Sequence, residues 1–301
     1  MPELPEVALY VDALERTIGG QTLTRVRLKS PSLLRTWDPP LAAAHGQRVL
    51  AFRHLGKRIV WELENELFLV FHLMVGGRFH LRKAGAALAK GAHAAFDFPD
   101  LTLLLTEAAT KKKASLHLVR GEAALAELDP GGIEPLATDL ADFRAALVRE
   151  DRTLKRALTD PRILSGIGNA HSDEILHQAG LSPVRRTRQL SDEEMARLHA
   201  VTVRHLRTWT ERLKAETGDR FPEKVTAFHP AHAVHGRHGE PCPVCGTTVQ
   251  RIRYADRETN YCPGCQTGGR LLADRALSRL LGADFPRSLE ELEELRAARR
   301  K

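Results

Sequence analysis

The sequence predicts an α+β protein of several domains: an N-terminal β-sandwich with a flanking helix, a central helical domain and a C-terminal zinc β-hairpin. Three observations support this prediction. Residues 21–120 contain short β-type runs, residues 139–217 have helical periodicity, and all four cysteines fall between Cys242 and Cys265. The expected domains are 1–130, 131–230, 231–270 and 271–301.

The chain opens with a predicted extended arm that leads into a helix. Val7, Val11, Leu14 and Ile18 recur at helical spacing, and Gly19-Gly20 provide a stop signal. Pro5 suits a first helical turn, where a missing N–H is tolerated. Residues 2–6 are therefore expected just outside the N-terminus of this helix.

Short strands are predicted over the next hundred residues. Turn signals such as Pro39-Pro40, Glu64-Asn65 and Pro99-Asp100 separate several of them. Six or seven strands behind one helix suggest a β-sandwich or a barrel. The Ala-rich segment 84–95 is expected to be a loop. The predicted strands are Thr24–Leu28, Val49–Phe52, Arg58–Leu63, Leu67–His72, Gly77–Leu81, Leu101–Thr106 and Ser115–Val119.

A linker at Asp129-Pro130-Gly131-Gly132 ends this region. Beyond it, the tail from Leu271 contains an apolar helix and then a charged stretch, and its role, packing or a partner contact, stays open. Leu271, Leu272, Leu277, Leu280 and Leu281 mark the apolar helix. The helices expected before it are 139–149, 152–158, 171–179 and 191–217.

Composition bounds the function only loosely. The 301 residues carry a net charge of +7, which favours an anionic partner such as nucleic acid, although many soluble proteins are mildly basic. The first residues lack the basic and apolar regions of a signal peptide, and no apolar run approaches a membrane span. Clustered cysteines favour a metal in a reducing compartment. A cytoplasmic protein without a membrane partner is expected.

Two C-x2-C pairs predict a metal site: Cys242 with Cys245, and Cys262 with Cys265. Four thiolates can close a tetrahedral shell around Zn²⁺, and a unit of this size needs such a metal in order to fold. A closed shell leaves no position for water, so one structural zinc ion per chain is expected. An iron–sulfur cluster or reduced free thiols are the alternatives.

The residues between the two pairs predict a β-hairpin. Val249, Ile252 and Tyr254 alternate with polar residues, and residues 255–258 are expected to turn. Arg257 then lies at the tip, where a guanidinium can bind phosphate or enter a DNA groove. In an arbitrary hairpin, a solvated turn arginine is the more common outcome.

Pro2 presents a secondary amine once Met1 is removed. Such an amine can attack an electrophilic carbon, and α-amino groups have pKa values near neutrality. Glu3 can act as an acid or a base, and Glu6 lies one helical turn further on. By itself, this N-terminal pattern is weak evidence for catalysis, because proline and glutamate are ordinary residues at helix starts.

The chain resembles the formamidopyrimidine-DNA glycosylase/endonuclease VIII family in several motifs that occur in the family's order. The resemblance implies a bifunctional DNA glycosylase and AP lyase of base excision repair, a helix-two-turns-helix domain, damaged double-stranded DNA as partner and a monomeric state. The matching segments are Met1–Val7, His54–Arg58, His72-Leu73, Leu128–Leu136, Ser165–Leu176 and Val234–Cys265.

The resemblance also implies roles for single residues. Pro2 would attack C1′ and form a Schiff base, Glu3 would assist ring opening as an acid/base, and Glu6 would support the arm. Lys57 would contact the DNA backbone, and Lys155 would lie near the active site. The residues that match phosphate-binding positions are His72, Asn169 and Arg257, and those that match supporting positions are Asp160 and Glu174. For Asn169, the Gly166-Ile167-Gly168 turn before a helix independently predicts an anion site.

The sequence departs from the family where an extruded nucleotide leaves a gap in the duplex. The usual Met position falls on Val75, with Met74 one residue earlier, and the Arg/Phe loop is replaced by Lys111, Lys112 and Lys113. These lysines either bind the DNA strand opposite the lesion or form a solvated face of the protein. The segment 217–233, where relatives carry a lesion-capping loop, is short.

The chemistry is expected to be retained, while the damaged base stays open, with 8-oxoguanine or formamidopyrimidine favoured over oxidised pyrimidines. A catalytically inert DNA- or RNA-binding protein is a second interpretation. A zinc-ribbon transcription factor is a third, but it explains only the last 70 or so residues. Whether cleavage proceeds by β or by β,δ elimination is also left open.

Overall fold

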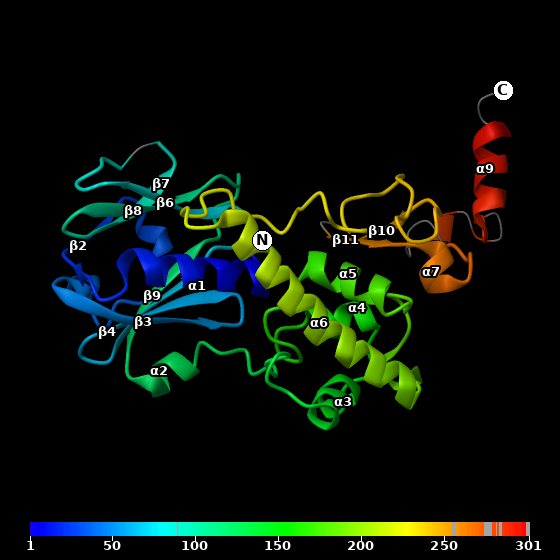
Figure 1. The fold of residues 1–301 in the computed structure, drawn as a ribbon, viewed down its shortest axis with the longest axis horizontal. Helices are drawn as coiled ribbons and strands as arrows, with labels where there is room; N and C mark the ends of the chain where they lie inside the picture. Colours follow the sequence, from blue (N-terminus) through cyan, green and yellow to red (C-terminus); the bar gives the residue numbers. More distant parts are fainter. Residues whose placement is uncertain (89, 255–256, 274–278, 281, 283–284, 299–301) are drawn as a thin grey trace. The chain divides into compact units, whose positions relative to one another are not determined.

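A computed structural model of the chain describes residues 1–88, 90–254, 257–273, 279–280, 282 and 285–298 (Figure 1). The chain forms two compact units. The sandwich unit comprises Met1–Leu136 and Leu206–Ala227, and the helical unit comprises Ala137–His205 and Phe228–Lys301. Residues 206–227, which the sequence places with the helical domain, thus group with the sandwich.

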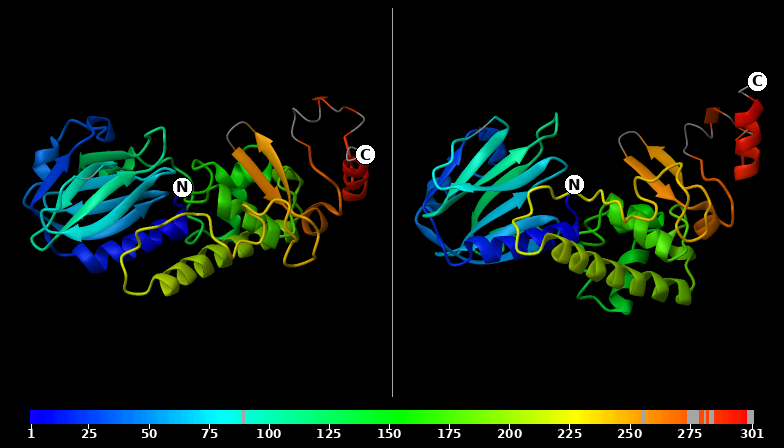
Figure 2. Two further views of the ribbon diagram at one scale, coloured as in Figure 1. Left: turned by 90° about the horizontal axis from the view of Figure 1, so that it is seen from above. Right: turned by 45° about the horizontal axis from the view of Figure 1, so that its top comes forward.

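The sandwich unit contains two antiparallel sheets and the helix α1 (Leu4–Ile18), as Figures 1 and 2 show. The strand order is β1-β3-β4-β5-β9 in the five-stranded sheet and β2-β7-β8-β6 in the four-stranded sheet. The strands are β1 (Thr22–Leu23), β2 (Arg25–Leu28), β3 (Gln47–Leu55), β4 (Arg58–Leu63), β5 (Leu67–His72), β6 (Gly77–Lys83), β7 (Ala92–Asp97), β8 (Leu101–Glu107) and β9 (Ser115–Arg120). Short helices η1 (Pro31–Leu33), η2 (Leu41–Ala44) and α2 (Glu122–Ala126) complete the unit.

The core lies between the two sheets and is centred on aromatic rings. Trp61 is fully buried, with its ring centroid 4.8 Å from that of Phe71 and 5.2 Å from that of Phe96. Alternate residues of the same strands, Val60 and Val70, face a smaller apolar cluster that includes Leu125 of α2. Both faces of β4 and β5 are therefore covered, which explains why these strands are apolar at nearly every position.

The sandwich prediction is confirmed, with several differences in its elements. The segment expected to be a loop ends in a strand, β7, which lies between β2 and β8. Ala94, Ala95 and Phe96 are buried there, so small side chains suit a crowded position in the sheet. The first helix begins at Leu4, so residues 4–6 form its first turn and do not precede it.

The helical unit confirms all four helices that were predicted for it, with shifts of a few residues at their ends. A two-stranded hairpin and short helices follow them. The elements are α3 (Leu140–Val148), α4 (Leu154–Thr159), α5 (Asn169–Gln178), η3 (Thr187–Gln189), α6 (Asp192–Thr217), β10 (Gln250–Tyr254), β11 (Arg257–Tyr261), α7 (Pro263–Thr267) and α9 (Leu289–Ala298). The last part of α6, from Leu206, belongs to the sandwich unit.

Two predictions near the C-terminus need correction. Arg257 and Glu258 begin the returning strand β11 and are not part of the turn, because Arg257 pairs with Tyr254 across the hairpin. The apolar helix expected from Leu271 is also wrong at its start, since Leu271 and Leu272 are not helical. Leu280 is helical, whereas Leu277 and Leu281 lie outside the described residues.

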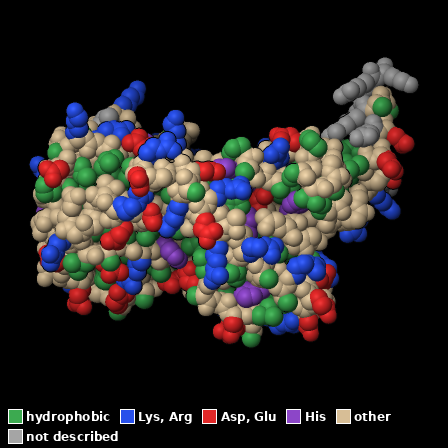
Figure 3. Space-filling view, in the orientation of Figure 1, with side chains coloured by type: hydrophobic (Ala, Val, Ile, Leu, Met, Phe, Trp, Pro, Cys, Tyr) green, Lys and Arg blue, Asp and Glu red, His purple; other side chains and the backbone are tan. Residues whose placement is uncertain are grey.

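On the face shown in Figure 3, basic and acidic side chains are interspersed and do not gather into one basic patch. Among the described residues, no helix combines the length and the apolar character needed to cross a membrane.

Candidate active site and nucleic-acid interface

The amino-terminal arm is held in place by the start of α1. Pro2 is buried, and Glu3, the N-cap residue, is only 3% exposed. The backbone N–H of Glu3 donates to Glu6 Oε2 at 2.7 Å, and the Glu3 carboxylate accepts from the backbone N–H of Glu6. This reciprocal capping box fixes both carboxylates beside the amino terminus.

The amino terminus lies in an environment that favours the unprotonated amine. In this structure Met1 carries the amine, and burial lowers its pKa below the usual 8.0. The nearby cations of Arg78 and Lys57 lower the pKa further, while Glu3 and Glu6 act in the opposite direction. The amine of Pro2 is one residue along the chain from this position. Arg78 was not predicted from the sequence.

A tight turn presents Lys57 at the end of the five-stranded sheet. Gly56 and Lys57 join β3 to β4, and Gly56 has a φ of +58°, as a two-residue hairpin turn requires. The pairing places Arg58 opposite His72, the last residue of β5. Lys57 and His72 are therefore brought to the same end of the sheet.

His72 belongs to a basic cluster that the strand register of the folded sheet brings together. Burial and the cations of Arg58 and Lys57 lower the pKa of His72 to about 4, and His117 contributes in the same direction. His72 is thus neutral at pH 7 and would meet a phosphate as a neutral N–H donor. Arg58 and His117 escaped the sequence analysis because their strand neighbours are known only once the register is known.

The two loops that depart from the family pattern are in contact. Val75 lies in the turn between β5 and β6 and is 63% exposed, whereas Met74 has a positive φ of +51° and is only partly exposed. The backbone N–H of Ala108 donates to the Gly76 carbonyl at 3.1 Å. A Cβ on Gly76 would lie 2.5 Å from the Ala109 nitrogen, so the contact requires glycine. Val75 is therefore the side chain presented at this tip.

The lysine loop is closed by a buried carboxylate. Glu107, 3% exposed, accepts the backbone N–H groups of Lys113 at 2.8 Å and Ala114 at 3.1 Å. The Lys112 ammonium donates to the Glu107 carbonyl. All three lysine residues of the loop, Lys111, Lys112 and Lys113, are exposed. The loop thus presents positive charge beside Val75 in a fixed conformation.

The segment that follows α6 is attached to the sandwich. Glu223 accepts from Arg82 at 2.6 Å and lies 3.1 Å from His80 Nδ1, while Val225 is buried in the sandwich core. The sequence pointed to this region as a short replacement for a lesion-capping loop. In the structure, residues 221–225 pack on the four-stranded sheet and its core.

In the helical unit, a glycine turn leads into α5. Gly166 has a φ of +78°, and Gly168 is the N-cap residue, with no side-chain hydrogen bond to cap the helix. Asn169 is the first helical residue. The Lys155 ammonium, 9% exposed, donates to the Asn169 carbonyl at 2.7 Å, to Ser172 Oγ at 2.8 Å and to Asp173 Oδ1 at 2.5 Å. Lys155 therefore fixes the turn that carries Asn169.

Two buried carboxylates of α5 attach the hairpin to this helix. Asp173 Oδ2 lies 2.8 Å from His235 Nδ1 and accepts from the Asn260 backbone N–H at 3.1 Å. Glu174 accepts backbone N–H groups of Ala233, Val234 and His235 at 2.8–2.9 Å. Glu174 thus joins α5 to the segment that leads to the first cysteine pair. Asp160 accepts hydrogen bonds from Arg162 and Arg152, which lower its pKa to about 2.

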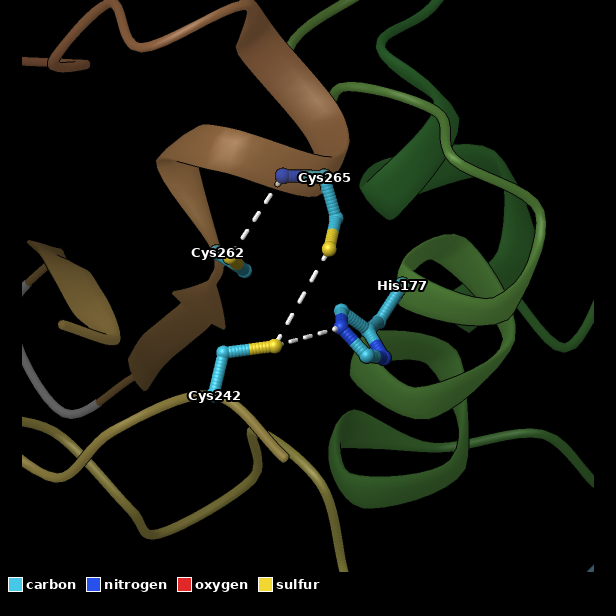
Figure 4. A group of neighbouring side chains, drawn as sticks. All are labelled: His177, Cys242, Cys262 and Cys265. Atoms are coloured by element: carbon cyan, nitrogen blue, oxygen red, sulfur yellow. Dashed lines mark hydrogen bonds between the residues drawn. The ribbon is translucent and has the colours of Figure 1, made fainter. Parts of the chain in front are cut away.

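The four cysteine sulfurs converge as a zinc shell requires. Cys245 Sγ lies 3.3 Å from Cys262 Sγ and 3.4 Å from Cys265 Sγ, and Cys242 Sγ lies 3.9 Å from Cys265 Sγ. In a tetrahedral Zn–thiolate shell, sulfurs are about 3.8 Å apart. The backbone N–H of Cys265 donates to Cys262 Sγ, as in a metal-binding knuckle. The residues fit one structural zinc ion. Figure 4 shows three of the cysteines with His177 of α5.

The predicted site residues fall into two groups. The sandwich unit brings Pro2, Glu3, Glu6 and Lys57 together, and it also holds His72 and the lysine loop. The helical unit holds Lys155 and Asn169 at the start of α5, the four cysteines, and Arg257 at the start of β11.

Three family models match successive parts of the chain. The formamidopyrimidine-DNA glycosylase N-terminal domain matches residues 1–112, and the H2TH domain of the same family matches residues 132–219. A zinc finger found in FPG and IleRS matches residues 239–268.

Relatives and solved structures agree with these matches. The formamidopyrimidine-DNA glycosylases of Heliobacterium modesticaldum and Thermus thermophilus are 35% and 34% identical, cover 88% and 89% of this chain, and are themselves covered completely. A structure of Lactococcus lactis Fpg with abasic-site DNA has a TM-score of 0.77 at 25% identity, with 88% of this chain and 99% of that chain covered. A complex of the same protein with Fapy-dG DNA has a TM-score of 0.77 at 26% identity, with 88% of this chain and 100% of that chain covered. The chain belongs to the formamidopyrimidine-DNA glycosylase family.

Proposed function

We propose that this protein removes an oxidised base from damaged double-stranded DNA and then cleaves the backbone, with the amine of Pro2 as nucleophile. The observation that carries the proposal is the partly buried amino terminus, which lies among Glu3, Glu6, Lys57 and Arg78. A base inside a duplex is out of reach, so the nucleotide must leave the stack. The protein acts as a monomer on DNA in the cytoplasm.

The chemistry follows from the properties of a secondary amine. The lone pair of Pro2 N forms a bond to C1′, and the damaged base leaves with the electrons of the glycosidic bond and takes up the proton that the attacking nitrogen loses. Glu3 donates a proton to the ring oxygen O4′, the C1′–O4′ bond breaks, and the N–C1′ bond becomes an iminium. Loss of a C2′ proton then expels the 3′ phosphate by β elimination.

The remaining predicted residues hold DNA in this proposal. Lys57 and the neutral His72 bind the backbone near the lesion, as hydrogen-bond donors at one end of the sheet. Asn169 binds phosphate at the start of α5, where exposed N–H groups favour anions. Arg257 binds phosphate from the hairpin. Glu6 and Lys155 act by position: Glu6 fixes Glu3, and Lys155 fixes the Asn169 turn.

The favoured substrates are 8-oxoguanine and formamidopyrimidine. The relatives named above are formamidopyrimidine-DNA glycosylases, and one Lactococcus lactis neighbour holds a Fapy-dG DNA. Excision rates on duplexes that carry a single lesion, each paired in turn with every opposite base, test which lesion class is preferred. The proposal expects the fastest excision for the purine lesions. Faster excision of oxidised pyrimidines assigns the other lesion class, and no cleavage of any lesion contradicts glycosylase activity.

A second candidate, an inert DNA-binding protein, is favoured only by the changed pair of loops around Val75 and Lys111–Lys113. It predicts binding to lesion DNA without strand cleavage. It also predicts that Glu3→Gln leaves DNA binding unchanged.

Glu3→Gln is expected to slow base excision by about 10²–10⁴-fold, the usual contribution of a general acid or base. The amide oxygen still accepts the Glu6 N–H, so the helix cap is retained and the thermal melting temperature should change little. Single-turnover excision rates measure the effect. Glu15→Gln, an exposed change on the same helix, is the control and should leave the rate unaltered. An equal rate for Glu3→Gln would remove Glu3 from the chemistry.

Arg78→Ala is expected to move the acid limb of the pH profile of kcat/KM to higher pH. A cation near the amine destabilises its protonated form, so its removal raises the amine pKa and reduces the reactive fraction at neutral pH. The profile of Arg82→Ala, a change on the same strand, should keep the wild-type midpoint. An unshifted limb in Arg78→Ala would mean that Arg78 does not act on the nucleophile.

Replacing Lys111 and Lys113 together by alanine is expected to flatten the salt dependence of DNA affinity by about two units of slope. Each lysine–phosphate contact contributes about 0.9 to the slope of log K against log salt. Lys83→Ala/Lys90→Ala removes the same charge from other exposed positions and should not change the slope. Equal slopes for both double variants would mean that the loop is a solvated face.

A further inference from the structure

The C-terminal turn of α5 reaches the zinc site through a histidine that the cysteine pattern does not predict. His177 is 5% exposed, and its Nε2 atom lies 3.3 Å from Cys242 Sγ (Figure 4). Nε2 also lies in a group with Cys262 and Cys265 whose donor atoms are all within 4.8 Å of one another. Cys245 is not in that group, but its sulfur lies 3.3 Å from Cys262 Sγ and 3.4 Å from Cys265 Sγ, so five potential ligand atoms are available for a metal that takes four.

The other ring nitrogen of His177 indicates which role the imidazole has. Nδ1 is buried and makes no hydrogen bond within the described part of the chain. A histidine that ligates a metal almost always donates its second N–H to a partner, which fixes the tautomer and the ring. If Nε2 bound zinc, Nδ1–H would be a buried donor without an acceptor. If Nε2 carries the hydrogen, Nδ1 needs no acceptor.

The cysteines can supply both the zinc ligands and the acceptor for the His177 N–H. Each of the four sulfurs lies within 3.9 Å of at least one other, so the cysteines can supply all four ligands and zinc needs no histidine. Four thiolates around Zn²⁺ leave two excess negative charges, and a buried N–H aimed at one sulfur stabilises that charge. Cys242 is itself buried, so water does not readily supply this hydrogen bond.

We propose that His177 is a positioning residue of the zinc site, whose Nε2–H donates to the Cys242 thiolate and attaches the end of α5 to the metal. The same helix begins at Asn169 and is bound to the hairpin through Asp173 and to residues 233–235 through Glu174. Zinc therefore stabilises the hairpin and also fixes the helix whose first residue is proposed to bind phosphate.

Replacement of the imidazole by an aromatic ring that has no N–H should weaken zinc binding. His177→Phe is expected to lower zinc affinity 10–100-fold, the usual effect of losing an outer-shell partner. Competition with a chromophoric chelator measures it on the full chain without DNA, so the result does not depend on the proposed activity. His177→Gln, which supplies an amide N–H, should restore part of the affinity. The control is His171→Phe, since His171 is buried on the same helix and bonds to His205.

A second measurement distinguishes the hydrogen bond from direct ligation. X-ray absorption of the zinc-loaded wild type should show only sulfur, at about 2.3 Å, and no nitrogen at about 2.0 Å. In the cobalt-substituted protein, His177→Phe should shift the thiolate charge-transfer band, which reports on the sulfurs and not on packing. A nitrogen in the first shell overturns the proposal, as does unchanged zinc affinity in His177→Phe. Should His177→Phe fail to fold, the His177→Gln affinity and the wild-type spectrum still decide.

Discussion

A blocked amino terminus abolishes both base excision and strand cleavage by this protein. Acylation of the terminal nitrogen, or retention of residues before Pro2, removes the lone pair that has to attack C1′. Pro2→Gly keeps an amine but loosens its placement. Since a misplacement of 1 Å costs about 10²-fold, we expect Pro2→Gly to lose at least that factor in single-turnover rate.

The matched control for this experiment is Pro5→Ala, because Pro5 lies in the first turn of α1, the helix that follows Pro2, and has no proposed chemical role. It should cleave lesion DNA at the wild-type rate. Binding of abasic-site DNA by the blocked protein should fall far less than its activity. Full cleavage by a protein whose blocked terminus has been verified by mass spectrometry would assign the nucleophile to another residue.

Cys262→Ser should lose zinc, the hairpin and most of the affinity for DNA together. Cys262 is completely buried, and its sulfur lies 3.3 Å from Cys245 Sγ, so the shell cannot close without it. Structural zinc contributes about 10–16 kcal/mol of apparent free energy to the folding of small zinc units. This contribution exceeds the free energy that their small apolar cores supply. Chelation of the wild type should have the same effect, with α1 and the sheets retained in circular dichroism.

Val244→Ser is the control, since Val244 lies between Cys242 and Cys245 of the other C-x2-C pair but is 74% exposed. Zinc content by elemental analysis and affinity for abasic-site DNA are the two measurements. A zinc-free variant that binds DNA as tightly as the wild type would mean that the hairpin has no part in DNA binding.

Periodicity predicted most of the fold because burial follows it. The helices at 139–149 and 191–217 and the strands at 58–63 and 67–72 lie where the pattern places them. The strand β7 was missed because Ala92–Asp97 carries mostly small residues. Their suitability for this position depends on the crowding between β2 and β8, which is a property of the packed sheet.

The candidate site was predictable where its chemistry depends on local spacing. The cysteine pairs predict zinc by themselves, and the Gly166-Ile167-Gly168 turn predicts the anion site at Asn169. The residues that escaped prediction act across the chain. Arg78 meets the amino terminus 77 positions away, and His177 meets Cys242 across 65 positions.

The proposed roles of the loops around Val75 depend on a contact that the sequence does not encode locally. Gly76 and Ala108 are joined by a backbone hydrogen bond, which places the lysine loop beside the exposed valine. The two departures from the family pattern, Val75 and the lysine loop, therefore lie next to each other. The double lysine variant tests whether the lysine loop binds DNA.

The central claim is that a covalent bond forms between Pro2 and C1′ of the damaged nucleotide. Reduction with borohydride during the reaction converts the iminium into a stable amine, and peptide mapping of the cross-linked protein locates the modified residue. The account predicts a single adduct on the amine of residue 2, absent in the blocked protein. An adduct on a lysine such as Lys57 or Lys155, or no adduct on lesion-bearing and abasic DNA that is nevertheless cleaved, would contradict it.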